Sequence, residues 1–204
     1  MKGLDWFKNI FSRKNSKDEI QFIEREEIRI IPDIPNFIVE EHQEVEVKLS
    51  LNQYNPFEKL SLIYKFLDTY GDFAENFTVC KKGCSACCKI GVKMTALEAH
   101  YIEKNTTHKI KFDKNRKMRN DDHCPFLKSN TCSIYKFRPF NCRTFYTIDH
   151  PKYCSTPDEI HQVYGSNGGE GIPMIHQFRR YINMINGKRD HTELRKFFGH
   201  SNDS

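Results

Sequence analysis

All eight cysteines of this 204-residue chain lie between positions 80 and 154. Buried structural cysteines behave as small apolar residues and would be scattered along the chain. A disulfide framework requires an oxidising compartment, and no secretory signal is visible at the start, where Asp5 and Lys8 interrupt the apolar residues. The clustering therefore predicts a metal-binding protein in the reducing cytoplasm.

The spacing divides these cysteines into two groups. The early group is Cys80, Cys84, Cys87 and Cys88, and the late group is Cys124, Cys132, Cys142 and Cys154. The late cysteines are too far apart along the chain to form a metal knuckle alone, so we expect the two groups to meet in the fold. Adjacent side chains diverge in most backbone geometries, so we expect Cys87 and Cys88 to serve different ions, or one of them not to be a ligand.

The identity of the metal stays open between two candidates. Four thiolates complete either a tetrahedral zinc site or a cubane iron–sulfur cluster, and eight cysteines suffice for one site or two. The Cys80-x3-Cys84-x2-Cys87 spacing matches that of radical-SAM enzymes, although the strand–helix alternation of their barrel is missing. Cys124-Pro125 resembles the Cys-Pro of ferredoxins. We favour iron–sulfur slightly over zinc.

Capping signals and apolar periodicity predict several helices. One begins at Asn55-Pro56 and either ends near Gly71 or resumes through Phe77, a second runs from Thr95 to about Lys104, and a third runs from Pro173 to Gly187. A last short helix is expected over 192–198, and the alternation in residues 44–49 predicts a short strand. Residues 124–154 lack periodicity. The fold class we predict is mainly α, a small α-rich domain with an irregular, metal-organised centre.

Charge is distributed unevenly along the chain. Lys and Arg number 32 against 27 Asp and Glu, so the net charge is only +5. Residues 18–47 are nevertheless acidic and residues 104–119 are basic. We favour an acidic arm that covers the basic stretch over a basic patch for nucleic acid, because aromatic residues are sparse among those bases. We divide the chain into an N-terminal extension or acidic arm (1–50) and a cysteine-cluster metal-binding domain (51–204). No apolar run is long enough to span a membrane.

The motifs over roughly residues 78–154 resemble those of a known family. They are Cys80-x3-Cys84-x2-Cys87-Cys88, Val92-x-Met94-Thr95-x-x-Glu98, Cys124-Pro125-Phe126-Leu127, and Cys132-Ser-Ile-Tyr135-x-x-Arg138-Pro139-x-x-Cys142-Arg143-Thr-Phe145. In this order they resemble the YkgJ-type cysteine-cluster proteins, which are described as zinc- or iron-chelating. The resemblance implies metal chelation by the first seven cysteines. We add Cys154 because of its position near them.

Two classes of function remain open. In the first, the chain is a redox or group-transfer enzyme that uses its metal centre. In the second, the metal is structural zinc and the chain is a binding or adaptor module without catalysis. Arg138 and Arg143 flank Cys142 and are candidate cofactor-binding residues, which would neutralise a thiolate-rich cluster or face an anionic ligand. A protein partner is compatible with either class, whereas the substrate and the catalytic residues cannot be named.

Overall fold

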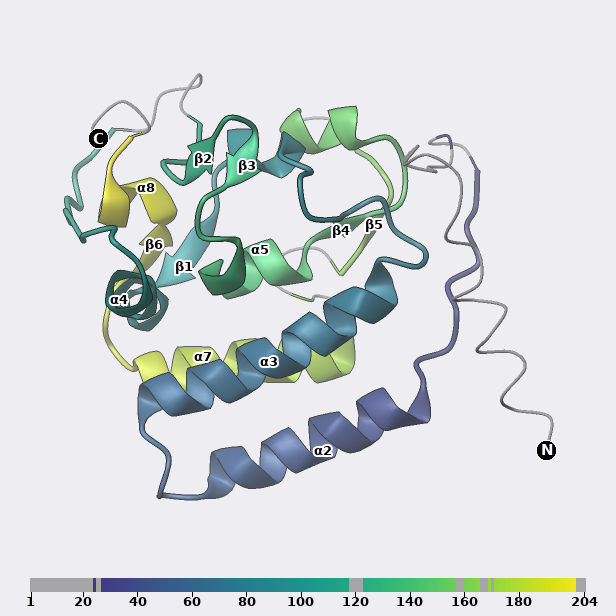
Figure 1. Ribbon diagram of the computed structural model, residues 1–204, viewed down its shortest axis with the longest axis horizontal. Coiled ribbons are helices and arrows are strands. Elements are labelled where there is room, and N and C mark those ends of the chain that lie inside the picture. Colours follow the sequence, from purple (N-terminus) through teal and green to yellow (C-terminus); the bar gives the residue numbers. More distant parts are fainter. Residues whose placement is uncertain are drawn as a thin grey trace.

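Three helices pack against one another and carry the irregular cysteine region on one side. The computed structural model describes residues 24, 27–117, 123–156, 160–165, 169 and 171–200. Helices α2 (Asn36–Ser50), α3 (Pro56–Ala74) and α7 (Pro173–Asn186) each contact the other two, and α3 and α7 overlap in the view of Figure 1. The prediction of a mainly α fold is confirmed.

The remaining elements are short. Helices α4 (Ala96–Asn105), α5 (Phe140–Thr144) and α8 (Leu194–Phe198) lie on the side of the three long helices that carries the cysteine region. Among the described residues the strands form three two-stranded antiparallel ribbons: β1 (Lys93–Thr95) with β6 (His191–Glu193), β2 (Leu127–Lys128) with β3 (Thr131–Cys132), and β4 (Tyr146–Thr147) with β5 (Val163–Tyr164). Short 3-10 helices cover 86–89, 135–137 and 151–155.

Helix α3 begins as its capping sequence predicts. The Asn55 side chain accepts hydrogen bonds from the amides of Phe57 (2.9 Å) and Glu58 (3.1 Å), while the Glu58 carboxylate accepts one from the Asn55 amide at 2.7 Å. The helix does not end near Gly71 but continues to Ala74. Ala74 is fully buried, so tertiary packing compensates for the weak helix propensity of glycine.

The predicted strand over 44–49 is wrong, because those residues lie within helix α2. The buried positions of α2 are Ile38, His42, Val45 and Leu49, which recur at intervals of three and four and so share one helical face. Val47, which alternation would have placed on the same side as Val45, is 63% exposed. This part of the predicted N-terminal extension therefore packs on α3, and residues 1–23 lie outside the described residues.

The described parts of the acidic and the basic stretch contact different elements of the fold. Acids of α2 contact α3 and α7, as in the hydrogen bond from Thr69 to Glu41 (3.3 Å). The described part of the basic stretch follows α8 instead, where the amide of Lys111 donates to the carbonyl of Phe197 at 2.7 Å and Arg116 donates to the carbonyl of Arg195 at 2.6 Å.

The C-terminal segment pairs with strand β1, which precedes helix α4, and packs against α4 itself. Helix α4 has the predicted capping box, in which Thr95 and Glu98 bond reciprocally. Strand β6 pairs with β1 in the register Met94 to Thr192, so the helix predicted over 192–198 begins as a strand and becomes α8 only at Leu194. No helix among the described residues is long and apolar enough to cross a membrane.

The cysteines lie at the border between two hydrophobic clusters. The first cluster fills the space between α2, α3 and α7, and Cys80 packs against it. The second surrounds α4, α8 and Phe126, and Cys124 and Cys132 pack against that one. A bound metal at this border would tie the two clusters together.

Candidate metal centre

Tight turns present the early cysteines. The chain leaves α3 and turns at Gly83, whose φ of +99° lies in the left-handed region that favours glycine. The amide of Cys84 donates to the carbonyl of Lys81 at 3.0 Å, and the amide of Cys88 donates to that of Ser85, also at 3.0 Å. These turns bring Cys84, Cys87 and Cys88 to one side of the loop.

Two short elements present the late cysteines. The β2–β3 hairpin turns through Ser129 and Asn130, both with positive φ, which is the turn type that suits a two-residue hairpin. It places Cys132 opposite Leu127. Helix α5 then begins directly after Pro139 and carries Cys142 in its single turn.

The two groups of cysteines meet, as predicted. A cavity of about 60 Å³ is lined by six of them, and we call it the six-cysteine cavity. Its other walls are mainly apolar and include Ile90, Phe126 and Leu194. The six cysteines come from both groups: Cys84, Cys87, Cys88, Cys124, Cys132 and Cys142.

Two further spaces adjoin this cavity through shared thiols. A side cavity of about 50 Å³ is lined by Cys80, Cys84, Cys87 and Cys142 together with Tyr146 and Arg138. A larger cleft of about 380 Å³ is lined by Cys87 and Cys142 and by Lys93, Asn141 and Arg179. Cys87 and Cys142 therefore lie where all three spaces join.

Burial and mutual hydrogen bonds raise the pKa of several thiols that line the six-cysteine cavity. The pKa of Cys87 is raised well above its usual value, mainly by a hydrogen bond to Cys88 and secondly by burial. A hydrogen bond to Cys124 raises the pKa of Cys88 to about 12. Burial raises the pKa of Cys142 well above its usual value, and the neighbouring thiols of Cys87 and Cys88 add to the shift. A cation at this position would reverse the balance, because thiolates are the ligating form.

The donor set fits a soft metal. Thiolates select zinc or iron–sulfur clusters over magnesium or calcium, which prefer oxygen ligands. Among the residues that the structure describes, no three histidine, cysteine or carboxylate side chains are already arranged to hold an ion. The sulfurs line one cavity, but Cys87, Cys88 and Cys124 are hydrogen-bonded to one another in series. Ligation therefore requires side-chain rotation as well as loss of protons.

Cys154 lies beside the early group but does not line either cavity or the cleft. It is buried in the 3-10 helix over 151–155, which contacts the one over 86–89. Burial raises its pKa to about 12, and nearby Cys87 and Cys84 contribute to the shift. Cys80 and Cys154 thus flank the six-cysteine cavity.

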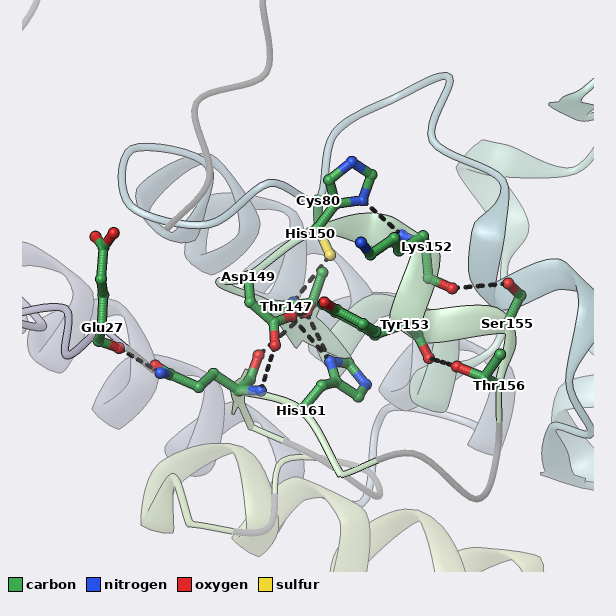
Figure 2. A network of polar contacts seen from close by, with 11 residues as sticks. Glu27, Cys80, Thr147, Asp149, His150, Lys152, Tyr153, Ser155, Thr156 and His161 are labelled. Atoms are coloured by element: carbon green, nitrogen blue, oxygen red, sulfur yellow. Dashed lines mark hydrogen bonds and ion pairs between the residues drawn. The ribbon is translucent and has the colours of Figure 1, made fainter. Parts of the chain in front are cut away.

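Thr147 connects Cys80 to a buried polar network that sequence reasoning missed. Figure 2 shows Thr147 between Cys80, whose sulfur accepts a hydrogen bond from the Thr147 amide at 3.1 Å, and Asp149. Asp149 is fully buried; its carboxylate accepts from the Thr147 hydroxyl (3.0 Å) and lies 3.1 Å from Nδ1 of His161. No spacing in the sequence distinguishes these residues, because they meet only through the β4–β5 ribbon.

The two predicted cofactor-binding arginines lie in different environments. Arg143 is 1% exposed, and its guanidinium contacts Asp68, the carbonyls of Arg138 and Lys136, and the ring of Tyr64 at 4.3 Å. It therefore fixes the position of α5. The Arg138 guanidinium stacks 4.1 Å from the centre of the Tyr135 ring and lines both the six-cysteine cavity and the side cavity.

Arg195 is a second residue that the sequence did not indicate. It is 2% exposed and pairs with Glu193. Its guanidinium also donates to the carbonyls of Ile90 (3.4 Å) and His123 (3.3 Å), which border the early and the late group respectively. A charged side chain from α8 thus holds the two cysteine segments against each other.

Residues 79–162 match the CxxCxxCC family model, described as a "putative zinc- or iron-chelating domain". This interval contains all eight cysteines and extends through His161. The predicted resemblance is confirmed over this region, and the match supports zinc or iron chelation there. No curated protein and no solved structure matches the chain.

Proposed function

We propose that the chain binds a metal centre through cysteine thiolates of the six-cysteine cavity, and we favour an iron–sulfur cluster over zinc. The observation that carries the proposal is the convergence of six sulfurs from two distant segments on one cavity. The ligands come from both groups, with Cys80 and Cys154 as flanking thiols. When bound, the group would supply electron transfer as a cluster, or Lewis acidity and cross-linking as zinc.

The protein residues around the cavity have separable tasks in this proposal. Arg195 holds the early and late segments together through backbone carbonyls. Arg138 brings positive charge to the thiols, since it lowers the pKa of Cys132, although burial is the larger effect and raises it. Arg143 orients α5 and thereby Cys142. The predicted cofactor-binding role therefore falls on Arg138 more than on Arg143.

The large cleft favours a reactive metal centre over a purely structural one. It reaches Cys87 and Cys142, so a molecule in the cleft would lie next to the thiolates that we propose as ligands. Sites that hold a metal only for structure are closed, whereas reactive sites keep an accessible position. We therefore favour a redox or group-transfer role. We place the protein in the cytoplasm, because all eight cysteines are free thiols and a reducing compartment keeps them so.

A structural-zinc adaptor is the second candidate, and one observation favours it. The cysteines lie between two hydrophobic clusters, so a cross-link there would stabilise the domain even without chemistry. Such a protein would expose no metal position to the cleft.

Metal analysis of protein purified without oxygen tests the proposal and separates the candidates. We expect iron together with acid-labile sulfide and a brown absorbance that is lost on oxidation. Stoichiometric zinc in colourless protein would select the adaptor alternative and leave the metal site in place. Protein that retains neither metal after anaerobic reconstitution would refute metal binding itself.

A further inference from the structure

Two buried polar groups beside the cysteines have no hydrogen-bond partner within the described part of the chain. They are the hydroxyl of Tyr146 and the Nε–H of Arg138. Tyr146 is only 3% exposed, so solvent does not replace the missing partner. Buried polar groups are almost always satisfied in folded proteins, so an exception calls for an acceptor that the chain itself does not supply, such as an ordered water or a bound group.

Both groups line the side cavity. Four thiols line the same space, from Cys80, Cys84, Cys87 and Cys142. A neutral thiol accepts hydrogen bonds only weakly, whereas an ionised acceptor makes the shorter and stronger bonds. Conversion of these thiols to metal-bound thiolates would therefore create the acceptors that the two donors lack.

The two donors keep their protons. Burial raises the pKa of Tyr146, so its hydroxyl remains protonated at neutral pH. A guanidinium is always protonated, and its nitrogens can donate but not accept. A neighbouring thiol that donates therefore cannot satisfy the guanidinium, and the proton of the Tyr146 hydroxyl still needs an acceptor.

Both donors are also held in place by aromatic packing. The Tyr146 ring lies 6.5 Å from that of Tyr70 and 6.1 Å from that of Tyr164, measured between ring centres. The Arg138 guanidinium is stacked on Tyr135. Strand β4 already delivers one such bond, from the Thr147 amide to the Cys80 sulfur. The preceding residue on this strand, Tyr146, lines the side cavity together with that sulfur and three further thiols.

We propose that Tyr146 and Arg138 are positioning residues that donate hydrogen bonds to the metal-bound thiolates from the side cavity. This inference rests on the proposed metal centre and adds which groups tune it. Hydrogen bonds to ligating sulfur withdraw electron density, raise the reduction potential of a cluster and strengthen retention of the metal. Tyr146 and Arg138 would thus set the electronic properties of the centre without ligating it.

Three substitutions test the inference. Tyr146→Phe removes only the hydroxyl, and Arg138→Lys retains the charge but has no Nε–H. Tyr164→Phe is the matched control, because Tyr164 belongs to the same aromatic group but its hydroxyl bonds to Tyr70. The readouts are metal stoichiometry, the sulfur-to-metal charge-transfer band and metal transfer to a chelator. The reduction potential is added for a cluster, and cobalt substitution supplies the band if the native metal is zinc.

We expect both test variants to load metal fully but to hold it roughly 10–100-fold less tightly. Their charge-transfer bands should move to longer wavelength and a cluster potential should fall, whereas Tyr164→Phe should match the wild type.

Full loading with unchanged band and affinity in both test variants would overturn the inference and leave the metal centre standing. An equal band shift in Tyr164→Phe would show that the shift comes from changed aromatic packing, and it would also overturn the inference. If Tyr146→Phe fails to fold, Arg138→Lys decides alone. Wild-type protein that takes up no metal would instead refute the proposed function.

Discussion

The backbone amide of Cys124 donates a hydrogen bond to the carbonyl oxygen of Cys88 at 2.8 Å. This bond joins the last early cysteine to the first late one, although 35 residues lie between them in the sequence. Because it uses only backbone atoms, it does not depend on ligation or on the protonation of either thiol. The two cysteine groups are therefore brought together by the fold itself, and the metal would then cross-link segments that already touch.

Cys142 and Cys154 should respond differently to substitution. Cys142→Ser removes a sulfur from the junction of the six-cysteine cavity, the side cavity and the cleft, so we expect loss of most bound metal and a lower melting temperature. Cys154→Ser changes a flanking thiol and should retain most of the metal. Metal content and thermal unfolding of the two proteins, prepared in parallel without oxygen, check this. Equal loss in both would place Cys154 among the essential ligands.

Alkaline pH should destabilise the metal-free protein. The pKa values of Cys88 and Cys154 are raised to about 12 in the fold, from the usual value of 9.0. Between these values the unfolded chain loses protons that the folded chain retains, so the free energy of unfolding falls as pH rises. We expect constant stability from this source below about pH 8, and a decline above pH 9.

Urea unfolding of metal-free, reduced protein from pH 7 to 11 measures this decline. The control is Cys154→Ser, which removes one of the thiols whose pKa is raised and should make the decline shallower. A decline of the same steepness in that variant would show that Cys154 does not contribute.

Glu98 should be among the most sensitive positions outside the cysteines. Its buried carboxylate accepts hydrogen bonds from the Tyr64 hydroxyl (2.9 Å), the Phe140 amide (2.7 Å), and the amide and hydroxyl of Thr95 (both 2.8 Å). Glu98→Gln replaces one acceptor oxygen by a donor, so we expect a loss of about 3 kcal/mol in the free energy of unfolding.

Glu58→Gln is the matched control for this substitution. Glu58 occupies the same position in the exposed capping box of α3, where water can replace a lost partner, so its cost should be about 1 kcal/mol or less. Urea denaturation of both variants in the same metal state gives the comparison. Similar costs at the two positions would mean that the burial of Glu98 has no energetic consequence.

A pair of substitutions tests whether α2 belongs to the packed domain. Val45→Asp would bury a charge against the first hydrophobic cluster and should cost more than about 3 kcal/mol. Val47→Asp lies on the exposed face of the same helix and should change stability by only about 0.5 kcal/mol. Thermal unfolding distinguishes them. Tolerance of Val45→Asp would support the predicted division of the chain at residue 50.

Local signals in the sequence predicted local structure well. The capping boxes at Asn55 and Thr95 depend on residues three positions apart, and both form as expected. The period of α2 was misread because Glu44–Leu49 is too short a window: alternation over six residues also contains Val45 and Leu49 at helical spacing. The buried His42 and Ile38, further along the same face, decide between the two readings.

The sequence predicted the cysteines of the candidate site but not the other residues that surround them. Clustering of the thiols and the lengths between them predicted that both groups share one place. Arg195 reaches that place from far along the chain, and Tyr146 and Asp149 gain their environments from the β4–β5 ribbon. Such contacts depend on tertiary structure, and a single sequence carries no signal for them.

The contacts of Arg195 with both cysteine segments bear on when the cavity is completed during protein synthesis. Leu194 and Arg195 form part of the wall of the six-cysteine cavity, yet the ribosome adds them after all eight cysteines. While the last cysteine is leaving the ribosome, the thiols therefore lack this wall and remain open to solvent and oxidants. Metal delivered before then would meet an incomplete cavity, so the proposed centre would be completed only after translation has passed residue 195.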